Sequence, residues 1–353
     1  MREVVVVTGA GAGVGRAAAL EFARHGCDVA LLSRDPRRLE SAAGEVRRFG
    51  VRALAIPLDV ADAEAVRGAA DQIERALGPI CVWVNVAMAT VFAAVHQLTA
   101  AEIERATAVT YLGQVHGILA ALHHMRRRGH GSIVCVGSAL AHRAIPLQSA
   151  YCGAKFAIRG FVGALRSELI HDRLNIAVSE VDLPAVNTPQ FDWARNKTGR
   201  RLQPVPPIYQ PEVAARAIYQ AAFHPRRQVW LGFSTVKAIL ANRLVPGLLD
   251  RVLARSGYDG QLEPGSAAPE RAGNLFQPVA GDYGAHGRFD DRARSSAYLG
   301  GGAYGLLLGA TFAIGAVAGL RLLAGRSRGS ADGPARLRTT RRRSVFSTRP
   351  VRR

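Results

Sequence analysis

Tyr151 and Lys155 stand four residues apart in the sequence Tyr151-Cys152-Gly153-Ala154-Lys155, at the start of an expected helix. Positions i and i+4 share one face of a helix, so the phenol and the ammonium group would lie side by side. A phenol with a pKa of about 10 is a poor proton shuttle near neutral pH, and a neighbouring cation favours its ionised form. Lowering the pKa of Tyr151 to about 7 would take about 4 kcal/mol. The pair predicts proton transfer to or from a reacting oxygen.

Ser138 adds a hydroxyl thirteen residues before Tyr151. It follows the apolar run 133–136 and Gly137, which places it at the carboxyl end of an expected strand. Open α/β sheets bind their ligands at these strand ends. We therefore expect Ser138 to share a site with the tyrosine and the lysine.

A glycine-rich turn follows the first apolar run of the chain, residues 4–7. Its sequence is Thr8-Gly9-Ala10-Gly11-Ala12-Gly13-Val14-Gly15, and a helical pattern begins directly after it. Glycines let the backbone approach a pyrophosphate, whose charge is then met by free N–H groups at the helix N-terminus. The turn predicts dinucleotide binding through Gly9, Gly13, Val14 and Gly15. The alternative is a tight turn that binds no ligand.

The end of the second apolar run indicates which dinucleotide is bound. A carboxylate there would pair with a ribose 2′-OH, whereas a basic group would accept a 2′-phosphate. The chain has Leu32-Ser33-Arg34, with no acid at the first turn position and a guanidinium one residue later. Because Arg makes charge-assisted bonds to phosphate, Ser33 and Arg34 favour NADP(H) over NAD(H). The alternative for Arg34 is a solvated loop residue.

Two kinds of segment alternate along the chain and would bring these groups to one edge. Short aliphatic runs alternate with stretches of helical periodicity, which is the pattern of βαβ units. The runs are residues 4–7, 29–32, 51–56, 80–84, 133–136, 176–181 and 229–231, and the helical stretches are 16–25, 36–49, 63–77, 101–127 and 151 to about 171. We expect an α/β fold, a Rossmann-like doubly wound parallel sheet with helices on both faces, plus a C-terminal extension.

Taken together, the motifs resemble the short-chain dehydrogenase/reductase family over residues 1 to about 235. The glycines fit T-G-x-x-x-G-x-G and not G-x-G-x-x-G, and the serine and the Y-x-x-x-K motif follow in the family's order. The resemblance implies hydride transfer between a nicotinamide and a carbonyl or alcohol carbon. It implies that Tyr151 is the general acid/base, that Ser138 holds the substrate oxygen, and that Lys155 also binds the nicotinamide ribose.

The same resemblance implies further cofactor contacts. Leu58-Asp59-Val60 is similar to the family's adenine-contacting Asp and the main-chain site beside it. Asp59 could instead be a helix N-cap, a role for which Asp62 competes. Thr188 matches a position that commonly touches the nicotinamide amide and the diphosphate. A homo-oligomer is also implied.

Three departures from the family pattern limit what can be carried over. The N-N-A-G motif is Asn85-Val86-Ala87-Met88 here, which keeps only the first Asn to brace the sheet beside the cofactor. Thr110 stands where many members carry the Asn that holds a water in the proton relay to the catalytic lysine. Its hydroxyl could hold that water or bond back to its own helix carbonyl. The P-G turn is Pro184-Ala185.

The substrate side is less well defined by the sequence. Phe191 and Trp193 fall where family members have a mobile loop over the substrate, so they favour an apolar substrate or anchor the loop. His123, His124, His130 and His142 show no spacing that pairs two on one face with a third ligand, and we expect no metal. His142 could line the pocket.

The C-terminal part changes in composition. We divide the chain into a catalytic domain (1–235), an amphipathic helical extension (236–256), an irregular or disordered linker (257–297), a candidate transmembrane helix (298–324) and a basic disordered tail (325–353). Residues 299–320 carry no charge and are long enough to cross a bilayer. Residues 321–353 hold eleven Arg and one acid, which suits anionic lipid and, without interleaved aromatics, gives little support for nucleic acid.

The composition sets the remaining expectations. An apolar fraction of 48% with 21% charged residues is typical of a globular protein. Four scattered cysteines, and a first strand with no signal peptide before it, indicate a reducing compartment. We expect an NADP(H)-dependent oxidoreductase on a small carbonyl or alcohol, membrane-associated with its catalytic domain in the cytoplasm. The alternatives are a soluble cytoplasmic location and a non-catalytic NADP(H)-binding regulatory or scaffold protein.

Overall fold

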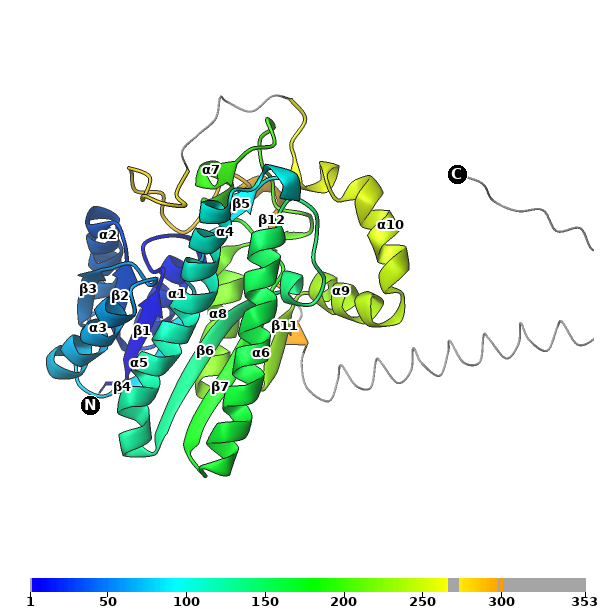
Figure 1. The fold of residues 1–353 in the computed structure, drawn as a ribbon. Helices are drawn as coiled ribbons and strands as arrows, with labels where there is room; N and C mark the ends of the chain where they lie inside the picture. The colour runs from blue at the N-terminus through cyan, green and yellow to red at the C-terminus, as the bar shows by residue number, and fades with distance from the viewer. Residues whose placement is uncertain (1, 266–272, 298, 301–353) are drawn as a thin grey trace, which may run out of the picture. The chain divides into compact units, whose positions relative to one another are not determined.

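The computed structural model describes residues 2–265, 273–297 and 299–300. The chain divides into two units, Met1–Leu306 and Leu307–Arg353, and the second lies outside the described residues. The first unit is built on one large sheet (Figure 1), whose strands run in the order β13-β11-β7-β6-β4-β1-β2-β3. All pair in parallel except β13, which pairs antiparallel at the edge. The strands are β1 (Val4–Thr8), β2 (Asp28–Ser33), β3 (Ala53–Pro57), β4 (Ile80–Asn85), β6 (His130–Ser138), β7 (Asn175–Leu183), β11 (Gln228–Leu231) and β13 (Leu299–Gly300).

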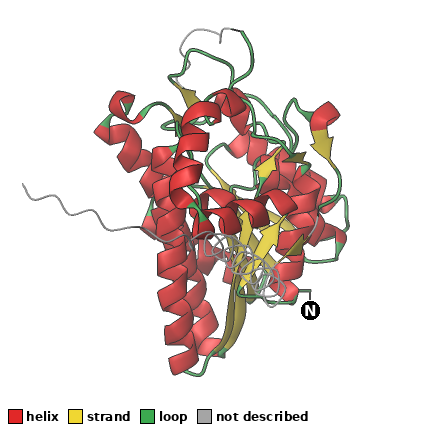
Figure 2. Ribbon diagram, turned by 90° about the vertical axis from the view of Figure 1, so that its right-hand side faces the viewer, coloured by secondary structure: helices red, strands yellow, loops and turns green. Residues whose placement is uncertain are grey.

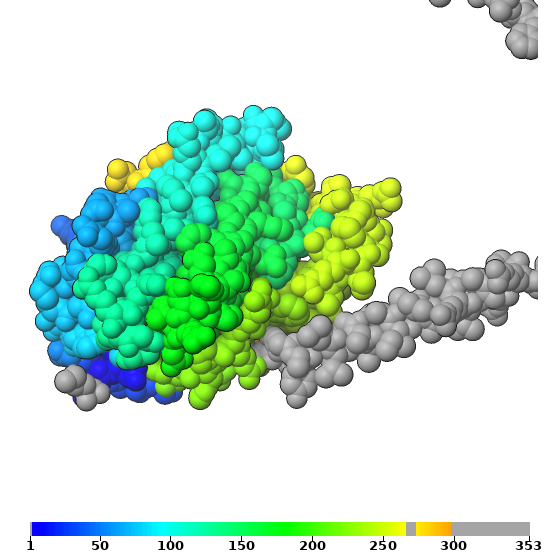
Figure 3. All heavy atoms as spheres, turned by 60° about the horizontal axis from the view of Figure 1, so that its bottom comes forward, coloured from blue at the N-terminus to red at the C-terminus, as the bar shows by residue number. Residues whose placement is uncertain are grey.

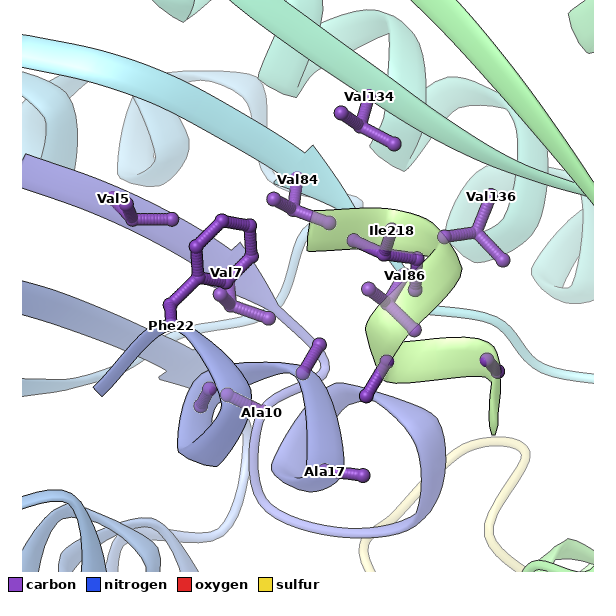
Figure 4. Close-up of a cluster of buried hydrophobic side chains, with 14 of the residues drawn as sticks. Val5, Val7, Ala10, Ala17, Phe22, Val84, Val86, Val134, Val136 and Ile218 are labelled. Atoms are coloured by element: carbon purple, nitrogen blue, oxygen red, sulfur yellow. The ribbon is translucent and has the colours of Figure 1, made fainter. Parts of the chain in front are cut away.

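Both faces of the sheet are covered by helices, which explains the unbroken apolar runs. Val5 and Val7 of β1 lie in one hydrophobic cluster, part of which Figure 4 shows, and Val4 and Val6 lie in the other. One face is covered by α1 (Gly13–Arg24), α2 (Pro36–Arg47) and α8 (Pro211–Phe223), and the other by α3 (Ala63–Ala76), α5 (Gly113–Arg128) and α6 (Ser149–His171). Successive side chains of a strand point to opposite faces of the sheet. Because both faces are covered, odd- and even-numbered residues of the strand are buried alike. The doubly wound fold expected from the sequence is confirmed.

The strand order reverses at β1, which lies between β2 and β4. On the two sides of β1 the chain connections run in opposite directions, toward β2 on one side and toward β4 on the other. This divergence opens a crevice at the carboxyl end of β1. Thr8 ends β1 there, and Asn85 and Ser138 end β4 and β6 at the same edge. The sheet topology thus gathers the predicted site residues.

The helical stretch expected over residues 101–127 is interrupted. It consists of α4 (Ala100–Thr107), a π-helical turn η2 (Ala108–Leu112) and α5. Thr110 in this turn is fully buried and bonds to the backbone of Ala89, and Gly113 lies so close to Val60 that a Cβ would stand 2.6 Å from it. The π-helical turn therefore packs this helical segment against the loops that carry Ala89 and Val60. Both loops border the crevice, and π-bulges are frequent at such sites.

The C-terminal part differs from the expected extension and linker. The amphipathic stretch forms two helices, α9 (Phe233–Leu244) and α10 (Pro246–Ser256), because Pro246 ends the first. Residues 274–290, which we call the strap, are irregular as expected but packed: Leu275 and Phe289 are buried. In Figure 1 this segment runs across the top of the unit near α2 and α7.

Short elements complete the unit, and Figure 2 shows short strands and helical turns above the long strands of the sheet. A three-stranded sheet has the order β12-β10-β8, and a two-stranded sheet pairs β5 with β9. These elements are β5 (Val91–Phe92), η1 (Val95–Gln97), η3 (Ala139–Ala141), β8 (Ala185–Val186), α7 (Gln190–Trp193), β9 (Arg195–Asn196), β10 (Ile208–Tyr209), η4 (Asp259–Gln261), η5 (Asp290–Arg292) and β12 (Ala293–Arg294).

The candidate membrane helix falls almost wholly outside the described residues, as does the basic tail. Its first residues, Leu299–Gly300, form β13 beside β11. In the part of the chain that the structure describes, no helix is long and apolar enough to span a bilayer.

Candidate active site

One cavity of about 460 Å³ runs along the crevice from the glycine turn to Tyr151. The predicted site residues that line it come from six segments of the chain: Gly9, Gly13, Val14, Gly15, Ser33, Arg34, Asp59, Val60, Ser138, Tyr151, Lys155 and Thr188. Two predicted residues, Asn85 and Thr110, do not line it. The side chains of both residues are fully buried.

The glycine turn is packed as a close-fitting cradle. A Cβ on Gly15 would stand 2.2 Å from the Gly9 carbonyl oxygen, and Gly9 itself has a φ of +70° beside Ala87. A Cβ on Gly13 would meet Thr188 at 3.3 Å. No side chain caps the N-terminus of α1 at Ala12. The loop and the helix N-terminus therefore fit a group held through main-chain N–H donors, such as a pyrophosphate.

Tyr151 and Lys155 lie in the first turns of α6, with the Lys155 ammonium 5.6 Å from the centre of the Tyr151 ring. The Tyr151 phenol is hydrogen-bonded to Ser138. Lys155 is 1% exposed, and its Nζ donates to the Val136 carbonyl at 2.6 Å. The structure thus brings the three predicted catalytic residues together.

The pKa of Tyr151 shifts in the direction opposite to the one expected from its neighbour. Burial raises it above the usual value for a phenol, and the hydrogen bond with Ser138 lowers it only in part. Burial also lowers the pKa of Lys155 to about 8, against the charges of Asp182 and Glu180, which raise it. Burial makes Lys155 a weaker cation, and its charge does not offset the burial of Tyr151, so the chain alone does not ionise the phenol.

A buried pair behind Ser138 was missed by the sequence analysis. Asp182 on β7 accepts a hydrogen bond from the Ser138 N–H at 3.1 Å, and its other oxygen lies 2.9 Å from His142 Nε2. Both side chains are buried, at 0% and 5% exposure. His142 therefore does not line the pocket as expected. The sequence feature that could have identified Asp182 is an acidic residue inside an apolar strand.

Two charged contacts stabilise the end of the crevice beside β2 and β3. Asp62 caps α3, which leaves Asp59 free of that role, and Asp59 pairs with Arg105 instead. Arg34 does line the cavity, but its guanidinium donates to the carbonyls of three strap residues, Asn274, Leu275 and Phe276, at 2.5 to 3.3 Å. Arg34 is therefore not a solvated loop residue.

Thr110 and Asn85 have structural contacts in place of the expected ones. The Thr110 hydroxyl donates to the Ala89 carbonyl at 2.8 Å and accepts from the Ala89 N–H, so it bonds to neither its own helix nor the cavity. Asn85 Oδ1 accepts from the Trp83 indole, and its Nδ2 has no partner among the described residues. The relay role of Thr110 stays a prediction.

The substrate end is apolar, and its aromatic residues both line the cavity and anchor their loop. Phe191 packs between Phe92 and Phe289, with ring centres 6.3 and 5.8 Å apart. Trp193 packs edge-on against Tyr283 of the strap at 4.7 Å. Ser234, Thr235 and Ala238 of α9 also line the cavity, and most of this helix lies beyond residue 235, where the sequence analysis ended the catalytic domain.

A group of possible metal ligands lies away from this cavity. Asp71, His123 and His124, on α3 and α5, have ligand atoms within 4.8 Å of one another. The Asp71 carboxylate is 2.9 Å from His124 Nε2. The histidine spacing alone could not reveal this group because its third member comes from another helix. None of the three lines the cavity.

Comparison with known proteins is consistent with this geometry. Residues 3–198 match the family model for short chain dehydrogenases. The chain is 29% identical to YxnA of Bacillus subtilis, an uncharacterized oxidoreductase, over 79% of each chain, and 28% identical to mouse estradiol 17-beta-dehydrogenase 11 over 71% of this chain and 82% of that one. An alcohol dehydrogenase of Thermococcus sibiricus solved with 5-hydroxy-NADP superposes with a TM-score of 0.56, at 26% identity over 65% and 96%. The chain belongs to the short-chain dehydrogenase family.

Proposed function

We propose that the protein is an NADP(H)-dependent oxidoreductase that interconverts an apolar ketone or aldehyde and the corresponding alcohol. The observation that carries the proposal is the meeting of Ser138, Tyr151 and Lys155 at one end of the cavity whose other end is the glycine cradle. A proton donor and the proposed dinucleotide site would thus share one continuous space.

The chain's residues would divide the work as follows. The dinucleotide, when bound, supplies or accepts the hydride. Tyr151 gives its phenolic proton to the carbonyl oxygen during reduction and takes a proton from the alcohol during oxidation. Ser138 holds the same oxygen through its hydroxyl. Lys155 lies on the same helix face and stabilises the phenolate once the site carries more positive charge than the chain alone provides.

The preference for NADP(H) rests on the charge at the end of β2. Ser33 and Arg34 line the cavity there, and Arg34 is followed by Asp35, whose carboxylate is already used to cap α2. The cap engages Asp35 Oδ1, and Oδ2 lies 3.6 Å from the Arg38 guanidinium, so this acid is less available to a ribose hydroxyl. The archaeal alcohol dehydrogenase of similar fold was solved with an NADP derivative.

An apolar substrate is supported by the apolar residues that line the end of the cavity near Phe191. Phe92, Phe191, Trp193, Leu183 and Val205 line this end. The mouse relative of this chain is named for the alcohol estradiol, which is a lipophilic secondary alcohol. A lipophilic alcohol or ketone of this general class fits the lining.

We further propose that the protein associates with an anionic lipid surface through α10. On α10, Leu248 and Val252 are about half exposed and stand four residues apart on one helix face, and Leu244, the last residue of α9, is exposed as well. Arg251 and Arg255 stand next to them on the same helix and are exposed. An apolar stripe beside a basic one is typical of helices that lie in a membrane interface. In Figure 3, α9 and α10 project from one side of the unit in yellow-green.

We also propose a homo-oligomer. Leu119 of α5 and Phe156 of α6 are exposed by 56% and 43%, on neighbouring helices of one face of the sheet. Exposed apolar residues that gather on adjacent helices are typical of subunit interfaces. Sedimentation would measure the state.

The test is a substrate panel with the Tyr151→Phe variant as control. Purified wild-type protein is mixed with NADPH and a series of apolar ketones and aldehydes, and NADPH absorbance is followed. We expect consumption with at least one compound, a loss of at least about 1,000-fold in Tyr151→Phe, and unchanged NADPH affinity in that variant. NADPH binding without consumption on any compound would support the non-catalytic alternative, and absence of dinucleotide binding would refute both.

A further inference from the structure

The strap is hydrogen-bonded to the groups that would bind the phosphates of the cofactor. The Gly13 N–H, at the first turn of α1, donates to the Gly284 carbonyl at 3.0 Å. Arg34 donates to three strap carbonyls. The Gly13 N–H is a donor that the glycine turn would offer to a pyrophosphate. Arg34 is the donor that the end of β2 would offer to a 2′-phosphate.

A second arginine of the crevice is held in the same way. Arg38 Nε donates to the Gly281 carbonyl at 2.9 Å, and its Nη2 donates to the Val279 carbonyl. Its guanidinium lies 4.9 Å from the Trp193 ring centre and 5.4 Å from that of Tyr283. Arg38 therefore contacts the substrate loop and the strap from its place on α2, through hydrogen bonds and cation–π contacts.

Asp282 anchors the strap beside the glycine turn. Its carboxylate receives hydrogen bonds from Arg16 Nη1 and Ser41 Oγ, both at 2.5 Å, and Arg16 is 2% exposed. Burial would raise the pKa of Asp282, but these hydrogen bonds lower it to about 2. The carboxylate thus stays charged, and it binds a buried guanidinium of the helix that carries the glycine turn.

Carbonyl oxygens and phosphate oxygens are both acceptors, so they cannot share these donors without repulsion. The cavity remains open beneath the strap, because Asn274 and Pro278 line it together with the glycine turn. A dinucleotide could therefore place its nicotinamide end beside Tyr151 only if its phosphate end displaced the strap carbonyls.

We propose that the strap is an internal competitor of the cofactor: its residues 274–284 occupy the Gly13 N–H of the glycine turn and the guanidinium of Arg34, and NADP(H) binds by displacing them. The inference rests on the proposed dinucleotide site. The cofactor's apparent affinity is reduced by the fraction of molecules in which the strap is closed. Because Arg38 and Tyr283 touch Trp193, displacement by the cofactor also frees one wall of the substrate end.

The first experiment measures NADPH affinity without turnover. Asp282→Ala removes the anchor but leaves Arg16 paired with Glu45 at 3.0 Å. We expect the dissociation constant for NADPH, measured by fluorescence titration, to fall about tenfold, which corresponds to about 1.4 kcal/mol of strap closure. The matched control is Asp250→Ala, which breaks a different Asp–Arg pair, with Arg143, on exposed α10 and should leave the affinity unchanged.

The second experiment uses the unaltered protein. Hydrogen exchange is followed with and without NADPH, and deuterium uptake is compared in peptides that cover residues 274–284. Displacement predicts faster exchange of this segment on NADPH binding, whereas α1 and the glycine turn become slower. Slower exchange of the strap, or weaker NADPH binding by Asp282→Ala, would overturn the inference and make the strap a cover that retains the cofactor. If neither protein binds a dinucleotide, the proposed function fails as well.

Discussion

The carboxyl group of Glu180 occupies an unusual position for an acid, in the middle of β7 with 1% exposure. Burial and the neighbouring charge of Asp182 raise its pKa to about 7, and its Oε1 has no hydrogen-bond partner among the described residues. Between pH about 4.5 and 7 the folded protein thus holds a proton that the unfolded chain releases, so stability falls as pH rises through this window.

Glu180→Gln should remove that pH dependence because an amide resembles the protonated acid. We expect the variant to be more stable than the wild type by on the order of 2 kcal/mol at pH 8 and equally stable at pH 4.5. Urea unfolding at the two pH values measures the difference. A stability gain of equal size at both pH values would show that the charge of Glu180 is not the cause.

The Asp182–His142 pair positions the Ser138 backbone. Asp182→Ala would leave the Ser138 N–H and His142 Nε2 buried without a partner, at a cost of about 3 kcal/mol of unfolding free energy. Asp182→Asn keeps an acceptor for the Ser138 N–H, so we expect it to restore most of kcat, while the alanine variant loses about tenfold with little change in KM. Equal kcat in the two variants would argue against positioning through this bond.

Among the elements, the glycine turn makes the sharpest prediction. A Cβ on Gly15 would overlap the Gly9 carbonyl at 2.2 Å, so Gly15→Ala must shift the turn or α1. We expect NADPH affinity to fall at least about tenfold, or about 1.4 kcal/mol. Gly163→Ala in α6 is the matched control, because nothing lies within 4 Å of its Cβ, and it should add about 0.5–1 kcal/mol of stability with unchanged affinity.

The elements also show what sequence can and cannot predict here. Strands such as β1 and β4 were placed within about two residues because a sheet buried on both faces requires continuous apolar runs. The contacts of Arg34 with the strap could not be predicted, because its partners are main-chain carbonyls that every residue carries. Residues 257–294 have no apolar period, so isolated anchors such as Leu275 and Phe289 gave no signal of packing.

For the molecule as a whole, α9 connects the cavity to the proposed lipid surface. Ala238 of α9 lines the cavity, and α9 is followed, after the break at Val245, by α10 with its exposed Leu248 and Val252. A substrate dissolved in lipid would thus enter near the surface that carries it. Association through α10 would then raise activity toward apolar substrates presented in vesicles.

This arrangement can be tested by cosedimentation of the full chain with vesicles containing anionic lipid. The Arg-rich tail and α10 should contribute differently: binding by exposed charge is screened by salt, whereas insertion of apolar side chains is not. We expect wild-type protein to keep part of its binding in about 1 M salt, where the Debye length is about 3 Å. Replacing Leu248 and Val252 together by Asp should lower this salt-resistant binding at least about tenfold, and the control Val95→Asp, at a site 70% exposed on η1, should not. Salt-resistant binding that survives in the double variant would assign the lipid contact to another part of the chain.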